Sequence, residues 1–131
     1  MKKYLLDTHY LIWAMKTPDK LKTGVRKIIE DTKNPIYVSQ VSLWEIAIKQ
    51  KIGKLEILDK LENFKIEIEK TGFIWLKIED KHIFETLEIQ AFENHKDPFD
   101  RLLIAQAKIE NLTIITDDEK FRLYSEIEIL V

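Results

Sequence analysis

The stretch HKDPFDRLLIAQA, residues 95–107, carries more information about this chain than any other segment. It puts two carboxylates, Asp97 and Asp100, at the start of a predicted helix that reaches about residue 109, with Pro98 at the first helical position. Three other acids lie where the chain leaves or re-enters regular structure. These are Asp7 in LLDTH, Glu45 in SLWEIA and Asp118 in ITDD. Acids from four distant segments meet only if the fold gathers them, and a hard cation is the usual reason to gather them.

Apolar runs that predict strands alternate with helical spacing along the whole chain. Strands are predicted over residues 3–6, 36–38, 73–78, 112–115 and 127–131. Helices are predicted over residues 8–16, about 21–29, from 39 or 42 to about 53, 57–70, about 83–91 and 98–109. This alternation is typical of an α/β fold with a parallel sheet of about five strands, covered on both faces. Because no linker, repeat or low-complexity segment interrupts the pattern, residues 1–131 are expected to form one domain.

The predicted order of elements brings the four acids to one edge of the sheet. Ligand sites in open α/β sheets lie outside the carboxyl ends of the strands. Asp7 follows the first strand directly, and Asp118 comes just after the fourth. Glu45 lies on the helix after the second strand, and Asp100 lies at the start of the helix that leads into the fourth. We therefore expect these carboxylates to converge.

Helix capping is the alternative interpretation of these acids. Asp97, followed by proline and then by an acid in the third helical position, fits an N-cap, and Asp7 and Asp118 can each cap the helix that follows. Capping is the main interpretation of Asp97, with a peripheral role at a metal left open. Capping explains acids at helix starts, but it does not explain Glu45 if its helix begins at Ser39.

The helix that contains Glu45 can begin at either of two serines, and each start gives Glu45 a different position in the helix. The residues SLWE, 42–45, fit a capping box in which Glu45 lies in the first turn. If the helix begins at Ser39 instead, Glu45 lies mid-helix among apolar neighbours, where an unpartnered carboxylate is costly. Lys49, one turn further on, can pair with it there. The sequence leaves both registers open.

The histidines and tryptophans give weaker signals. His82 is expected at the surface or at a helix edge. His9 and His95 lie close in sequence to two of the acids, but neither has metal-ligand spacing with another histidine, so a hydrogen-bonding role is expected. All three tryptophans have apolar neighbours and are predicted to be core residues: Trp13, Trp44 and Trp75.

Composition narrows the class of protein. The chain has 131 residues, is 45% hydrophobic and contains no cysteine, so disorder, disulfides and thiolate metal sites are all excluded. The longest apolar run covers residues 10–15, far short of a membrane span, and a cytoplasmic protein with no membrane partner is expected. The net charge is −2. If four or five acids are clustered in one site, the rest of the protein carries a charge of roughly +2 to +3. Charge therefore neither supports nor excludes a nucleic-acid substrate.

Four segments in this order resemble the PIN-domain family, specifically the VapC-type ribonuclease toxins of bacterial toxin–antitoxin pairs. The segments are LLDTH with LIW, SLWEIAIK with GKL, HKDPFDR with AQA, and the closing TDD. The resemblance runs nearly end to end and implies a PIN-like (Rossmann-like) sheet. It also implies Mg²⁺ or Mn²⁺, cleavage of single-stranded RNA, a homodimer and a small antitoxin partner.

The site residues of the family carry over to this chain by the same resemblance. The four acids are the ones already singled out: Asp7, Glu45, Asp100 and Asp118. The hypothesis is that Asp7, Asp100 and Asp118 place the metal, while Glu45 binds a second ion or orients the attacking water. Mutual repulsion is expected to raise pKa values in the metal-free cluster.

Neighbouring residues have expected supporting roles. Thr116 is expected to orient the site through its hydroxyl, and Asp117 can share the role of its neighbour Asp118. Lys49 or Arg101 is expected to offset phosphate charge.

Two alternative functions belong to other classes of protein. A non-catalytic PIN-like module that binds RNA or protein is favoured by loss of an acid, and none is lost here. A Mg²⁺-dependent phosphatase needs an Asp-x-Asp pattern after the first strand, which the DTH of residues 7–9 lacks.

Overall fold

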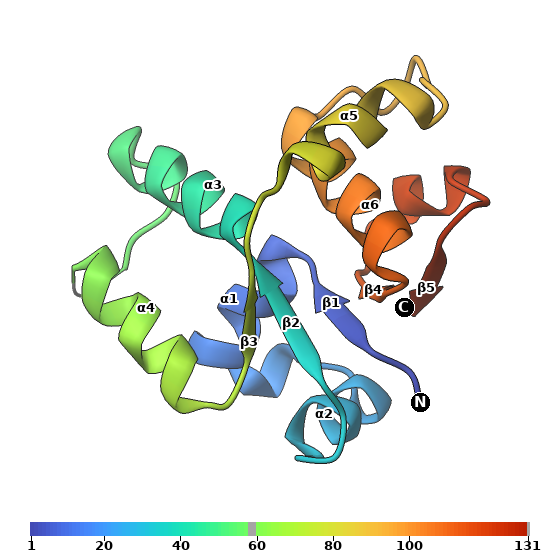
Figure 1. Cartoon of the computed structure of the whole chain (residues 1–131). Helices are drawn as coiled ribbons and strands as arrows, with labels where there is room; N and C mark the ends of the chain where they lie inside the picture. Colours follow the sequence, from blue (N-terminus) through green and yellow to red (C-terminus); the bar gives the residue numbers. More distant parts are fainter. Residues whose placement is uncertain (58–59, 131) are drawn as a thin grey trace.

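A five-stranded parallel sheet forms the centre of the computed structural model, which describes residues 1–57 and 60–130 (Figure 1). The strand order is β3-β2-β1-β4-β5, and each neighbouring pair is parallel. The strands are β1 (Tyr4–Leu6), β2 (Ile36–Ser39), β3 (Ile74–Leu76), β4 (Thr113–Ile115) and β5 (Glu128–Leu130). The predicted α/β class and strand number are confirmed. Part of the predicted helix over 57–70 and the last residue of the predicted strand over 127–131 lie outside the described residues.

Helices connect the strands. They are α1 (Thr8–Lys16), α2 (Thr23–Glu30), α3 (Gln40–Lys51), α4 (Leu61–Lys70), α5 (Asp80–Glu88) and α6 (Pro98–Glu110), with 3₁₀ turns η1 (Pro18–Lys20) and η2 (Glu119–Leu123). Figure 1 shows α1 and α4 on one side of the sheet and α5 and α6 on the other. No helix within the described residues is both long enough and apolar enough to cross a membrane.

Two hydrophobic clusters fill the space between the sheet and these helices. Because successive strand residues point to opposite faces, Leu6 of β1 packs with Leu11 and Phe64 in one cluster, while Leu5 packs with Leu103 in the other. All three residues of β1 are buried, as expected for the central strand of a sheet covered on both faces.

The topology puts a crevice at the carboxyl edge of the sheet. From β1 the chain proceeds to β2 on one side and β4 lies on the other, so the connections diverge between β1 and β4. Such a switch point is where ligands bind in open α/β sheets. Leu6 is level with Ile115, and the Asp7 N–H donates to the Ile115 carbonyl at 3.1 Å. This register brings Asp7 beside the residues that follow β4.

Two helices, α3 and α5, expose large apolar side chains. On α5, Ile83 and Leu87 are 49% and 85% exposed, because the helix packs on α6 through polar residues such as Glu85, which pairs with Lys108 at 2.9 Å. Trp44, predicted as core, is 58% exposed. The side chains of α3 that point inward are Val41, Ser42, Glu45 and Ile46, and in that register Trp44 faces out.

Candidate active site

All four predicted acids line one cavity of about 150 Å³ at the carboxyl edge of the sheet. Its lining comes from the segments after β1, β2 and β4 and from the start of α6. The lining residues are Asp7, Thr8, His9, Glu45, Lys49, Asp97, Asp100, Asp118 and Phe121. The convergence inferred from the order of elements is therefore present in the structure.

Asp7 caps a helix and lines the cavity at the same time. One carboxylate oxygen, Oδ1, accepts the Tyr10 N–H at 2.8 Å, which caps α1. The other oxygen accepts the Thr116 hydroxyl at 2.5 Å, and Thr116 Oγ1 in turn accepts the Asp118 N–H at 3.0 Å. Thr116 therefore orients Asp7 from the end of β4, as the sequence predicted for its hydroxyl. Capping and site roles are not alternatives here.

Glu45 is mid-helix and nearly buried. Ser39 is the N-cap of α3, its hydroxyl oxygen accepting the Val41 N–H, so the capping-box register at Ser42 is wrong. Glu45 is 6% exposed; its Oε1 accepts the Thr8 hydroxyl at 2.7 Å, and its Oε2 pairs with Lys49 at 2.7 Å. A buried carboxylate is thus held by one hydroxyl and one ammonium.

Asp100 is oriented by a histidine. His95 Nε2 lies 2.9 Å from Asp100 Oδ2, and His95 Nδ1 lies 3.0 Å from the Tyr124 hydroxyl. Asp97 is the N-cap of α6, since its Oδ1 accepts the backbone N–H groups of Phe99 and Asp100 at 2.8 and 3.2 Å. The hydrogen-bonding role expected for His95 and the capping role of Asp97 are both confirmed. Asp97 also lines the cavity, on its exposed side.

Asp118 completes the ring of carboxylates. Its Oδ1 accepts the Lys120 N–H at 3.0 Å and so caps η2. The ligand atoms of Asp118, Asp100 and His95 lie within 4.8 Å of one another. The neighbouring Asp117 is exposed and is not among the lining residues of the cavity.

Burial dominates the electrostatics of this cavity. It raises the pKa of Asp7 to about 6, against the hydrogen bonds from Thr116 and Tyr10, which lower it. It also raises the pKa of Asp100 to about 6, against the hydrogen bond from His95. Raised pKa values are therefore confirmed for two of the acids. The main cause differs from the expected one: loss of water outweighs repulsion between carboxylates.

The two expected phosphate-binding cations have different positions. Lys49 lines the cavity beside Glu45. Arg101 is used in packing instead, because its guanidinium donates to the carbonyls of Thr86 and Gln90 at 2.9 Å each and so holds the end of α5 on α6. Among the described residues that line this cavity, Arg101 is absent. The structure therefore gives no support for a contact between Arg101 and the substrate phosphate.

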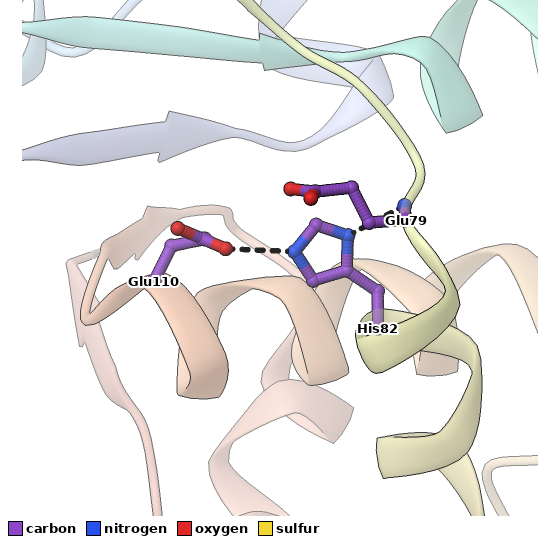
Figure 2. Close-up of side chains that lie close together, drawn as sticks. All are labelled: Glu79, His82 and Glu110. Carbon is purple, nitrogen blue, oxygen red and sulfur yellow. Dashed lines mark hydrogen bonds and ion pairs between the residues drawn. The ribbon is translucent and has the colours of Figure 1, made fainter.

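A second cluster, Glu79–His82–Glu110, joins α5 to α6 (Figure 2). His82 is fully buried, so its predicted surface position is wrong. Its Nδ1 accepts the Glu79 N–H at 3.0 Å, which leaves the proton of the neutral ring on Nε2, 2.9 Å from Glu110. Lys81 also pairs with Glu110 at 3.2 Å. Both ring nitrogens are therefore committed, and the cluster is a structural clamp rather than a metal centre.

Three site residues escaped sequence reasoning. Thr8 holds Glu45, Tyr124 holds His95, and Phe121 lines the cavity. Only Thr8 had a usable signal, since a hydroxyl directly after Asp7 and the first strand is placed at the same sheet edge. Phe121 lies in η2 and Tyr124 follows it, and no spacing in the sequence reveals the position of this turn against α6.

The residues of the cavity fit a hard divalent cation. Mg²⁺ and Mn²⁺ prefer oxygen ligands, and four carboxylates from four segments supply them. The raised pKa values of Asp7 and Asp100 show that the buried negative charge lacks full compensation from the protein. A bound cation would provide that compensation.

A parallel sheet of this topology with carboxylates gathered at its switch point defines a class of metal-binding α/β domain. The PIN domain family model matches residues 4–127, and the chain belongs to the PIN domain family. No curated protein matches the sequence.

Several solved structures share the fold at low sequence identity. The chain is similar to DNA-bound VapBC from Salmonella typhimurium, with 19% identity over 99% of this chain and 98% of the other, at a TM-score of 0.74. It is also similar to VapBC2 from Rickettsia felis bound to a promoter DNA fragment, with 18% identity over 98% and 97% of the chains and a TM-score of 0.68. A toxin–antitoxin complex from Klebsiella pneumoniae gives 17% identity over 98% and 96%, with a TM-score of 0.65. At these identities the likeness concerns the fold.

Proposed function

We propose that this PIN domain is the toxin component of a toxin–antitoxin pair and acts as a Mg²⁺- or Mn²⁺-dependent endoribonuclease on single-stranded RNA. The observation that carries the proposal is the single cavity lined by Asp7, Glu45, Asp100 and Asp118, with Lys49 beside them. Membership of the PIN domain family and the likeness to VapBC complexes support the same assignment. The expected cytoplasmic location belongs to this proposal.

The roles of the residues follow from their positions. Asp7, Asp100 and Asp118 would hold the metal, directly or through water, because their carboxylates line the same cavity. A bound ion would supply the positive charge that activates water and offsets the charge of the leaving oxygen of the phosphodiester. Glu45 accepts a hydrogen bond from the attacking water and thereby directs it at phosphorus.

Two further residues set the orientation of one acid and offset the charge of another. Thr116 fixes the rotation of the Asp7 carboxylate through its 2.5 Å hydrogen bond. Lys49 offsets the charge of Glu45 in the free protein and can turn toward a phosphate oxygen of the substrate, because its side chain is 35% exposed. An ammonium shared between a carboxylate and a phosphate keeps the cavity near charge balance as the RNA enters.

The partners form part of the proposal. An antitoxin would lay an apolar helix across exposed hydrophobic side chains and direct a basic group toward the carboxylates, which would block metal or substrate. A homodimer is the proposed assembly. The printed names of the structural relatives, VapBC and a toxin–antitoxin complex, support the antitoxin.

The alternative is a non-catalytic PIN-like module that binds RNA or protein. It is disfavoured because all four acids are present and lie around one cavity. The two functions separate in a cleavage assay on a mixed single-stranded RNA pool and on DNA of the same sequences, with wild-type protein and Asp7→Asn. RNA-selective cleavage by the wild type that Asp7→Asn lacks supports the nuclease. RNA binding without cleavage by the folded, metal-loaded wild type supports the module.

A further inference from the structure

His95 and Tyr124 form a buried pair directly behind Asp100. They are 3% and 4% exposed, and their contacts run in sequence from the Tyr124 hydroxyl to His95 Nδ1 at 3.0 Å and from His95 Nε2 to Asp100 Oδ2 at 2.9 Å. We propose that His95, with its proton held on Nε2 by Tyr124, is a positioning residue that orients Asp100 for metal coordination. The inference rests on the proposed function, since it assumes that Asp100 is a metal ligand.

The direction of these hydrogen bonds follows from their chemistry. An ionised carboxylate only accepts hydrogen bonds, so Nε2 must be the donor to Asp100. In a neutral imidazole Nδ1 then only accepts, and the Tyr124 hydroxyl must donate to it. Arg101 Nη1 lies 3.4 Å from the same hydroxyl oxygen and occupies a lone pair there, which leaves the hydroxyl hydrogen for His95. Arg101 therefore supports the site through Tyr124.

This arrangement distinguishes a positioning role from direct ligation. Distance alone would allow His95 to be a ligand, because its nitrogen lies within 4.8 Å of the ligand oxygens of Asp100 and Asp118. In the neutral imidazole, however, Nε2 carries the proton and Nδ1 accepts from Tyr124, and in the imidazolium both nitrogens carry protons. The imidazole has no lone pair left for the cavity. The imidazole instead fixes the rotation of the Asp100 carboxylate. Removing a group that hydrogen-bonds to a metal ligand typically weakens metal binding about 10- to 100-fold.

Packing holds the imidazole in place independently of these hydrogen bonds. The His95 ring lies 5.5 Å from the Phe121 ring and 5.4 Å from the Tyr124 ring, and Tyr124 stacks edge-on against Phe92 at 5.0 Å. The backbone N–H of His95 also donates to the backbone carbonyl of Phe92 at 3.2 Å. An aromatic residue at position 95 can therefore keep the packing while losing the hydrogen bonds, which makes the role testable.

Four substitutions test the inference by calorimetric titration of the folded protein with Mn²⁺. His95→Phe keeps a ring without a donor, His95→Gln restores an N–H donor, and Tyr124→Phe removes only the hydroxyl. His82→Gln is the control, because His82 is also a buried histidine on a carboxylate but lies in the clamp between α5 and α6. We expect His95→Phe to weaken Mn²⁺ binding about 10- to 100-fold and Tyr124→Phe to weaken it about 3- to 10-fold. His95→Gln should recover most of the affinity, and His82→Gln should bind Mn²⁺ like the wild type.

The outcomes separate this inference from the proposed function. Unchanged Mn²⁺ affinity in folded His95→Phe, or in Tyr124→Phe should the first variant not fold, overturns the positioning role and leaves the nuclease intact. Equal weakening in His95→Phe and His95→Gln also overturns it, because packing alone would then be responsible. Failure of the wild type to bind Mn²⁺ overturns both. In RNA cleavage, the positioning role predicts a lower kcat in His95→Phe that saturating Mn²⁺ partly restores.

Discussion

Thr116 and Asp7 are joined by a buried hydrogen bond of 2.5 Å, although 109 positions separate them in the sequence. The bond connects the ends of β1 and β4, the two strands between which the sheet connections diverge. It is made possible by the parallel register that sets Leu6 opposite Ile115. The candidate active site therefore depends on the central strand pair rather than on any local motif.

Thr116→Val keeps the size of the side chain and removes the hydroxyl. Asp7 then loses one hydrogen bond, and the Asp118 N–H loses its acceptor. We expect unfolding free energy to fall by about 1–3 kcal/mol, because buried polar groups are left unpaired, and Mn²⁺ affinity to fall about 10-fold. Chemical denaturation and calorimetric titration measure the two effects. Thr113→Val, at the buried threonine that begins β4, is the matched control and should leave Mn²⁺ affinity unchanged. Equal Mn²⁺ affinity in both variants contradicts the account of Thr116.

Lys49 and Glu45 form a pair in which the carboxylate is far more buried than the ammonium, at 8% and 35% side-chain exposure. Lys49→Met leaves the charge of Glu45 without its partner, so we expect a loss of about 1–3 kcal/mol of unfolding free energy, less than for a fully buried pair. Adding Glu45→Gln should recover most of it. The control is Lys65→Met, because Lys65 pairs with Glu69 in the same i,i+4 arrangement at the exposed surface, where an ion pair contributes little to stability. Urea denaturation of the set tests this, and equal losses in the two single lysine variants would count against it.

The contribution of Asp7 to the stability of the metal-free protein should fall as the pH rises from about 4 to about 6. Burial raises the pKa of Asp7 from 3.8 to about 6, so between those values the folded state binds more protons than the unfolded chain, and the unfolding free energy falls with pH. A difference of this size corresponds to about 3 kcal/mol. The measurement is urea denaturation of EDTA-treated protein at pH 4 to 7.5.

The comparison that isolates this effect is wild type minus Asp7→Asn, because other carboxyls titrate in the same range. That difference should become less favourable to the wild type across the window, and saturating Mg²⁺ should abolish the trend. A difference that is flat with pH, or that favours the wild type more as pH rises, would show that Asp7 is not the group held protonated.

Much of this site follows from the sequence, because chain order and helix starts are local properties. Asp7 and Asp118 could be placed at strand ends, and Asp97 at the start of α6, without any tertiary information. The register of α3 remained open between Ser39 and Ser42, since both hydroxyls can cap and only the packing of Val41 and Ile46 into the core decides between them.

The remaining features depend on contacts between distant segments. Helical spacing predicted a helix at about residues 83–91, but it does not reveal whether the apolar residues of that helix find a packing partner, and Leu87 remains 85% exposed. His82 was expected at the surface or at a helix edge, and its partner Glu110, 28 positions away, could not be identified from local sequence. Tyr124 follows the 3₁₀ turn η2, and only the fold brings it to His95.

The most direct test of the central claim is cleavage of a mixed single-stranded RNA pool by purified wild-type protein with Mg²⁺ or Mn²⁺ and with EDTA, beside Asp100→Asn. Glu110→Gln serves as a second variant, because Glu110 belongs to the clamp between α5 and α6 and not to the cavity. We predict metal-dependent cleavage that EDTA abolishes, that Asp100→Asn lowers by at least about 100-fold and that Glu110→Gln retains. Cleavage that persists in EDTA, or that is equal in wild type and folded Asp100→Asn, would contradict the assignment of this cavity as a metal-dependent nuclease site.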